Sequence, residues 1–252
     1  GEAGLGYMAS MFHLFTHAFF KSLLFLGAGA VIHMVHSNEM KDMGGLRKLM
    51  PITHAAFLIA CLAIAGIPPF AGFFSKEEIL TAAFHENKLI YGVALFTAAL
   101  TSFYMFRLYF NIFWSKDAVA KAHHDHGHAH DDAHDHGEGT WSMKLPLLIL
   151  TACAIGVGFI PFSQFITSDG LALETHIDLV FSIAPVTLSV IAILIAANFY
   201  KTQNAKSDKA VALFGGFYRA AYKKFYVDEL YLFITKKIVF PLIGQPIAWA
   251  DR

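Results

Sequence analysis

The sequence predicts an all-α integral membrane protein, a bundle of about five transmembrane helices with one broken helix, followed by an interfacial amphipathic segment. Three observations support this. The chain is 56% hydrophobic and 15% charged, with a mean hydropathy of +0.51, whereas soluble domains are about 45–50% apolar and about 25% charged. Five stretches are long enough to cross a bilayer, which takes about 20 apolar residues. One of them has two prolines near its centre.

The expected spans are residues 5–36, 52–84, 89–114, 145–165 and 177–200. Span 52–84 is too long for one plain helix. We assign residues 1–200 to the membrane bundle, with a loop at 115–144, and residues 201–252 to a linker and an amphipathic segment. The chain starts at Gly1 and enters an apolar run almost at once, so we expect it to be a fragment of a longer protein.

The last part of the chain mixes aromatic and charged side chains in "FYRAAYKKFYVDELYLFITKKIVFPLIG". Its charges recur too often for a buried span, which favours a position in the membrane interface. A long helix along the membrane surface and a surface helical hairpin both fit this pattern. The charged residues are Lys223, Lys224, Asp228, Glu229, Lys236 and Lys237.

Lysine and arginine in the short loops predict the orientation, because they are concentrated on the cytoplasmic side. The segment between the first two spans, the loop at 115–144 and the segment after the last span together hold twelve of them up to Lys224. The opposite side holds only Lys88. The first three segments are therefore expected to be cytoplasmic.

Span 5–36 carries three protonatable side chains at i, i+4 and i+8: His13, His17 and Lys21. Four residues turn a helix by about 400°, so these residues form one stripe about 12 Å long. A charge near the bilayer centre costs at least about 2.5–3.5 kcal/mol, so these groups need a use or a partner. They could form a proton relay, which we favour, or they could hydrogen-bond across helices and hold the bundle together.

Span 52–84 contains "AIAGIPPFAGFFSKEEIL". Pro68 and Pro69 lack backbone donors, and Gly66 and Gly72 flank them, so a helix cannot run straight through. We expect two half-helices around an unwound centre at residues 67–72. Such backbone is tolerated at membrane depth only inside protein or beside a water-filled cavity, and broken helices mark ion sites in transporters.

Lys76 follows this break, where a helix N-terminus disfavours a cation. We therefore expect a functional role for it. Glu77 and Glu78 are candidate supporting residues, but they also fit the simple start of the second half-helix or a position reaching solvent. Arg107 is a further candidate supporting residue, although it could also extend to the membrane interface.

Residues 123–139 read "HHDHGHAHDDAHDHGEG". This composition can bind Zn²⁺ or Cu²⁺, but it cannot form a packed core and is predicted to be disordered. We expect adventitious metal binding or none. The candidate ligands are His123, His124, His126, His128, His130, His134 and His136.

Five motifs together resemble one family: "MFHLFTHAFFKSLLFLGAGAVIH", "MGGLRKLMP", "GIPPFAGFFSKEEIL", "TSFYMFRLYF" and "KFYVDELY". They are similar to the L subunit of proton-pumping NADH:quinone oxidoreductase, respiratory complex I, whose mitochondrial counterpart is subunit five. The resemblance covers almost the whole chain and corresponds to roughly the second half of that subunit, from its eleventh to its fifteenth transmembrane helix.

The resemblance implies a second antiporter-like repeat in residues 1–200 and the beginning of a long lateral helix in residues 201–252. It implies that Lys76 is the broken-helix lysine and that Lys21, His17 and His13 are the residues connecting it. It further implies a multi-pass protein of the bacterial inner membrane, beside other complex I membrane subunits. NADH, FMN, iron–sulfur clusters and quinone are then expected in partner subunits, with no cofactor bound by this chain.

The leading hypothesis is proton translocation coupled to quinone reduction elsewhere in the complex. No Rossmann glycine fingerprint or clustered cysteines indicate redox chemistry in this chain itself. A subunit of an Mrp-type cation/proton antiporter or of a membrane-bound hydrogenase is the alternative, since these share the "GIPP" break and the lysine. A zinc transporter is a remote alternative, because Lys21 and Lys76 would repel a dication. Zero net charge gives no indication of a nucleic-acid partner.

Overall fold

The computed structural model describes residues 2–114, 139–166, 179–202, 212–213 and 215–250. Within these ranges every regular element is helical, which confirms the predicted all-α class. The chain divides into two compact units, Gly1–Gln203 and Asn204–Arg252. The bundle and the candidate site lie in the first unit.

The elements of the first unit follow the expected spans closely. In chain order they are α1 (Glu2–Val35), η1 (Met40–Asp42), η2 (Leu46–Lys48), α2 (Pro51–Ala65), α3 (Ala71–Glu86), α4 (Lys88–Phe113), α6 (Trp141–Gly156), η3 (Val157–Phe159), α7 (Ser163–Ile166) and α8 (Leu179–Tyr200).

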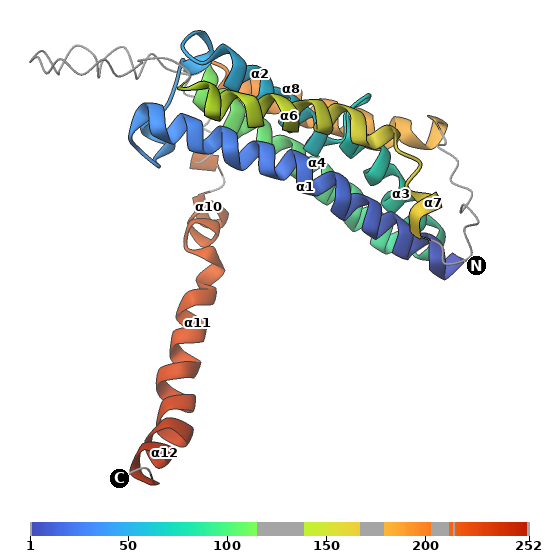
Figure 1. The fold of residues 1–252 in the computed structure, drawn as a ribbon. Helices are drawn as coiled ribbons and strands as arrows, with labels where there is room; N and C mark the ends of the chain where they lie inside the picture. Colours follow the sequence, from blue (N-terminus) through green and yellow to red (C-terminus); the bar gives the residue numbers. More distant parts are fainter. Residues whose placement is uncertain (1, 115–138, 167–178, 203–211, 214, 251–252) are drawn as a thin grey trace, which may run out of the picture. The chain divides into compact units, whose positions relative to one another are not determined.

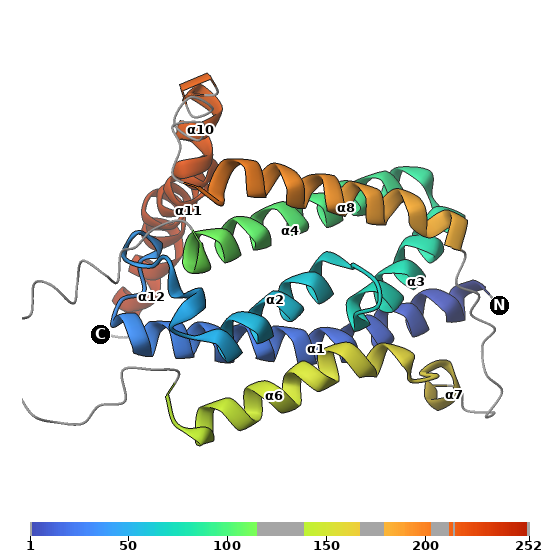
Figure 2. The same cartoon turned by 90° about the horizontal axis from the view of Figure 1, so that it is seen from above.

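The helix pair α2 and α3 lies end to end in the middle of this unit (Figures 1 and 2). Helix α1 packs along both of them, and α6 packs against α1 and α2. On the other side α4 packs against both α2 and α3, and α8 covers α4. At the interruption between α2 and α3, Gly66 is buried, Ile67 and Phe70 are half-buried, and Pro68 and Pro69 are exposed.

The core of the unit is built from large apolar side chains at these helix contacts. Phe20, Phe57 and Phe113 are at most 1% exposed, and they come from α1, α2 and α4. Other large apolar side chains point outward, such as Phe25 at 71% and Leu89 at 76% exposed. In a bilayer such side chains meet lipid, so outward apolar residues support a membrane-spanning bundle.

Four of the expected spans correspond to single apolar helices long enough to cross a membrane: Gly6–Val35, Lys88–Phe113, Trp141–Phe159 and Val180–Tyr200. The fourth expected span, 145–165, is shifted. Its helix begins earlier, at Trp141, and the regular winding ends at Phe159. Ile160 is extended (φ −71°, ψ 130°) and precedes Pro161, a position at which the following proline disfavours helical backbone.

The second unit contains α10 (Gly215–Tyr222), η4 (Lys224–Tyr226), α11 (Val227–Ile234), η5 (Thr235–Gly244, wound as a π-helix) and α12 (Gln245–Ala250). By length and composition, residues Lys224–Trp249 also qualify as a membrane span, with a mean hydropathy of 1.2 against 2.5 for Val180–Tyr200. This finding differs from the expectation that the charges exclude a span. The interfacial position of the segment stays a prediction.

Candidate functional site

The first half-helix, α2, ends in a left-handed turn at Gly66, where φ is 74° and ψ is 36°. Glycine adopts this conformation without the strain that a Cβ would introduce. The turn lets Gly66 N donate to Ala63 O at 3.0 Å and Ile67 N donate to Leu62 O at 3.1 Å. These are the two hydrogen bonds of a Schellman motif. The last two carbonyls of α2 need other donors.

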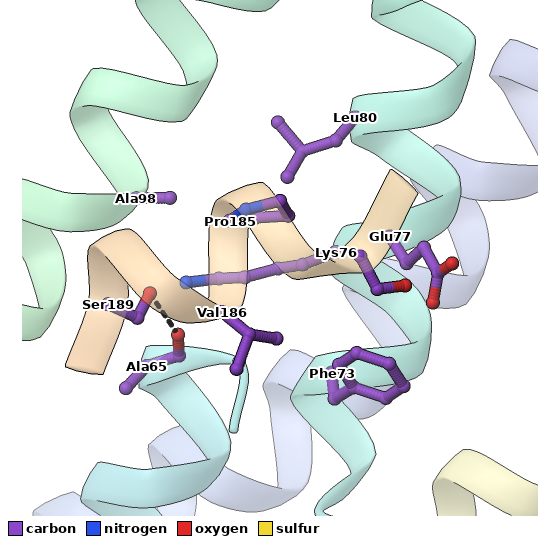
Figure 3. A pocket seen from close by; sticks show the side chains of 11 residues that line it. Ala65, Phe73, Lys76, Glu77, Leu80, Ala98, Pro185, Val186 and Ser189 are labelled. Atoms are coloured by element: carbon purple, nitrogen blue, oxygen red, sulfur yellow. Dashed lines mark hydrogen bonds between the residues drawn. The ribbon is translucent and has the colours of Figure 1, made fainter. Parts of the chain in front are cut away.

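Lys76 supplies the donor for one of them. Its Nζ donates a hydrogen bond to Ile64 O, although Lys76 itself belongs to α3. Its ammonium group therefore lies at the C-terminal end of α2, where the helix dipole favours a cation. Figure 3 shows the side chain extending from α3 toward Ser189. Lys76, in the second turn of α3, is thus stabilised by the end of another helix.

The other carbonyl, Ala65 O, accepts hydrogen bonds from two serines on the flanking helices. Ser189 Oγ of α8 lies 3.0 Å away and Ser102 Oγ of α4 lies 3.5 Å away, and both serines are at most 2% exposed. Ser102 also reaches Ala98 O at 3.0 Å, so its single proton has two alternative acceptors. Sequence reasoning did not single out Ser189; the available signal was a serine in a strongly apolar span.

A cavity of about 20 Å³ lies beside Lys76, between α2, α3, α4 and α8. Its polar lining consists of Lys76, Glu77, Ser182 and Ser189. A cavity needs about 10–15 Å³ to hold one water molecule, together with polar partners for that water. The site therefore has room for a water molecule next to the lysine.

The break itself spans residues 66–70, since α2 ends at Ala65 and α3 begins at Ala71. Pro68 and Pro69 lie in it as predicted, but Gly72 does not: it lies inside α3. Gly72 has a packing role instead, because a Cβ there would stand 1.9 Å from Ala63 O. The absence of a side chain at Gly72 lets α3 approach the end of α2.

Of the three stripe residues on α1 (His13, His17 and Lys21), His13 contacts α3 beside this site. His13 Nδ1 lies 3.0 Å from Ser75 Oγ on α3, next to Lys76 in the chain. The His13 and His17 ring centroids are 6.0 Å apart. The side chain of Lys21 is directed toward another residue of α1, since its Nζ lies 5.7 Å from the Phe25 ring centroid. In the described part of the chain, no hydrogen bond joins Lys21 to either histidine.

Glu77 is 4% exposed and lines the cavity, six residues after the start of α3. This overturns the interpretation that it simply begins the second half-helix or reaches solvent. In Figure 3 its carboxylate points away from the Lys76 ammonium. Glu78 is half-buried. Arg107 is exposed, with Cζ 5.5 Å from the centroid of the Tyr200 ring at the end of α8, as expected for a side chain extending to the interface.

Sequence reasoning also missed a polar cluster where α2 begins and α4 ends. His54 Nε2 lies 2.7 Å from Tyr109 Oη, and Trp114 Nε1 donates to the same oxygen at 3.2 Å. The Arg47 guanidinium carbon is 4.0 Å and the Lys201 Nζ 4.6 Å from the Trp114 ring centroid. Trp and Tyr with cations at helix ends are typical of the membrane interface. We interpret this cluster as an anchor of the helix ends.

Among the described residues, no group of three or more histidine, cysteine, aspartate or glutamate side chains could hold a metal ion. The histidine-rich residues 123–138 lie outside the described part of the chain.

The family profile described as NADH:quinone oxidoreductase/Mrp antiporter, transmembrane, matches residues 2–101, which include α1, the break and Lys76. NAD(P)H-quinone oxidoreductase chain 5 of Picosynechococcus sp. is 37% identical over 257 aligned positions, covering 90% of this chain and 39% of the relative.

Two further relatives carry similar names. The chloroplast subunit 5 of Mesostigma viride is 37% identical over 253 positions, covering 93% of this chain and 38% of the relative. Subunit 5 of the Paulinella chromatophora chromatophore is 58% identical over 115 residues, covering 42% of this chain and 17% of the relative. The chain thus spans about two-fifths of the length of the relatives that it matches almost end to end. It belongs to the NADH:quinone oxidoreductase/Mrp antiporter membrane family and is similar to subunit 5 of the quinone oxidoreductases.

Proposed function

We propose that this chain is part of a proton-translocating membrane subunit of NADH:quinone oxidoreductase. Lys76 alternately binds and releases a proton while quinone is reduced elsewhere in the complex. One observation carries this proposal: a half-buried lysine donates to the open end of a broken helix, beside a cavity with room for water. Discontinuous helices whose ends face ionic groups are the typical ion sites of membrane transporters.

The histidines of α1 would bring protons to this site. His13 contacts Ser75, the residue before Lys76, and the His17 ring follows it along α1. Water would complete the path between His13 and Lys76. Lys21 would extend the path toward the rest of the subunit, because it continues the same helical stripe one turn beyond His17.

The complete protein would act as one subunit of an oxidoreductase, with no redox chemistry in this chain. NADH, FMN, iron–sulfur clusters and quinone would bind to partner subunits, and the second unit would contact neighbouring antiporter-like subunits. We place the chain in a bacterial inner membrane, with the segments after α1, α4 and α8 on the cytoplasmic side. The count of lysine and arginine in these segments supports this orientation.

A subunit of an Mrp-type antiporter is the second candidate, since the description of the family profile names both assemblies. The relatives that cover most of the chain favour the first, because all those named above are subunits of quinone oxidoreductases.

The test is a lysine-to-alanine comparison in the full-length subunit within the assembled complex. Lys76→Ala removes the ammonium group at the end of α2, so we expect proton uptake per NADH oxidised in membrane vesicles to fall severalfold. Lys48→Ala is the matched control, because Lys48 is exposed beyond the helix ends. Normal uptake by an assembled Lys76→Ala complex would contradict the proposal.

A further inference from the structure

Two buried hydroxyl groups connect α1 with α3 beside His13. Thr16 and Ser75 are both 0% exposed. Ser75 Oγ lies 3.0 Å from His13 Nδ1 and 2.7 Å from Thr16 Oγ1. Thr16 Oγ1 also lies 3.1 Å from the backbone oxygen of His13. These three contacts form a closed loop that starts and ends on the same histidine.

The loop has two hydrogen-bond arrangements in which every hydroxyl proton and His13 Nδ1 are paired. Each hydroxyl carries one proton and can also accept. When Nδ1 carries no proton, Thr16 donates to Ser75 and Ser75 donates to Nδ1. When Nδ1 is protonated, it donates to Ser75, Ser75 donates to Thr16, and Thr16 donates to the His13 carbonyl. In both arrangements every hydroxyl proton and the imidazole Nδ1 has a partner.

We propose that Ser75 and Thr16 are positioning residues that let His13 gain and lose a proton at Nδ1 within the bundle. The switch needs only rotation of the two hydroxyls. Each hydroxyl carries one proton before and after the switch. The proton that Nδ1 gains comes from the water proposed between His13 and Lys76, and the same water takes it back when Nδ1 is deprotonated. A group that could only donate, or only accept, would pair with Nδ1 in one protonation state of His13. In the other protonation state it would leave a buried polar atom unpaired. Such a loss would bias His13 against that state by about tenfold.

The inference rests on the proposed function, since it supposes that His13 changes its protonation during turnover. The location supports a role beyond holding helices together. Ser75 precedes Lys76 on α3, and the two side chains diverge by about 100° around that helix. Ser75 faces α1 while Lys76 faces the cavity, so the loop lies between the stripe on α1 and the lysine site.

The experiment compares hydroxyl-deleting and hydroxyl-retaining variants of the full-length subunit in the assembled complex. Thr16→Val keeps the shape of the side chain but removes its hydroxyl, whereas Thr16→Ser keeps the hydroxyl and loses a methyl group. Ser75→Ala removes the central hydroxyl without adding volume. Thr151→Val is the control, because the Thr151 hydroxyl donates to Leu147 O of its own helix at 2.6 Å.

We expect Thr16→Val and Ser75→Ala to pump protons about tenfold more slowly, Thr16→Ser to pump close to the wild-type rate, and Thr151→Val to be unaffected. Wild-type pumping by Thr16→Val or Ser75→Ala would overturn the inference. So would an equal loss in Thr16→Ser and Thr16→Val, because packing would then be the cause. If these variants pump normally while Lys76→Ala does not, the hydroxyl loop fails and the proposed function stands.

Discussion

Lys76 has a binding partner at the end of a helix other than its own. An ammonium group at membrane depth costs at least about 2.5–3.5 kcal/mol. A partly buried helix C-terminus returns up to about 2 kcal/mol, and a hydrogen bond to a charged group about 1.5–3 kcal/mol. The opposing contributions are similar in size. The helix end and the hydrogen bond therefore offset much of the cost of holding the ammonium group at membrane depth.

Local sequence pattern identified Lys76 but not its partners. Lys76 was identified because a lysine after a Pro-Pro break would place a costly charge at membrane depth unless it has a function or a partner. Its acceptor, Ile64 O, is 12 residues away, and Ser189, which caps the neighbouring carbonyl, is 124 residues from that carbonyl. Such contacts depend on how the helices pack, and no periodicity in one segment encodes them. Ser75 was missed for the same reason.

The two glutamates after Lys76 give a prediction at this scale. Glu77 lines the cavity and Glu78 does not. A buried carboxylate that lines the same cavity influences the protonated lysine, because Coulomb energy falls only as the inverse of distance. We expect Glu77→Gln to slow proton uptake by vesicles about tenfold, corresponding to about 1.4 kcal/mol, and Glu78→Gln to have a smaller effect. Equal effects of both substitutions would show that the cavity does not distinguish them.

At the scale of elements, the broken helix depends on close contact between α2 and α3. The sequence predicted the break correctly, since proline and glycine act through local backbone geometry. It placed Gly72 wrongly, because a glycine required for close packing and a glycine required for a turn look alike in a sequence. Only the 1.9 Å approach of a Cβ at Gly72 to Ala63 O distinguishes them.

This contact gives a prediction for the glycines. Gly72→Ala would force α3 away from the α2 backbone, so we expect little assembled subunit or a strongly lowered melting temperature. Gly92→Ala in α4 is the control, because a Cβ at that position meets nothing within 4 Å. The measurement is the amount and thermal stability of the assembled complex. A Gly72→Ala complex as stable as the Gly92→Ala complex would refute the packing role.

At the scale of the whole molecule, hydropathy and charge predicted most of the fold. Long apolar runs can satisfy their backbone inside a bilayer only as helices, so the spans followed directly from composition. The end of span 145–165 was misplaced because apolar residues continue past Phe159, whereas the helical winding ends there, two residues before Pro161. Residues Lys224–Trp249 stay ambiguous for a related reason, since their apolar content and their charges favour different positions.

The histidine-rich segment gives a prediction at this scale. Residues 123–139 have almost no apolar side chains to bury, and the candidate site lies within α1, α2, α3, α4 and α8. We therefore expect deletion of these residues to leave NADH oxidation and proton pumping near wild type. A large loss of pumping in a normally assembled complex would contradict this and point to a metal-binding or regulatory role.

The central claim is that Lys76 works by losing and regaining its proton. Arginine keeps the positive charge and approximate length of lysine but stays protonated, with an unperturbed pKa of at least about 12.5. The decisive measurement is proton uptake per NADH oxidised in vesicles containing assembled Lys76→Arg complex, compared with wild type and Lys76→Ala. Our account predicts that the arginine variant pumps as poorly as the alanine variant. Full pumping by the arginine variant, with failure of the alanine variant, would show that Lys76 is a fixed structural charge.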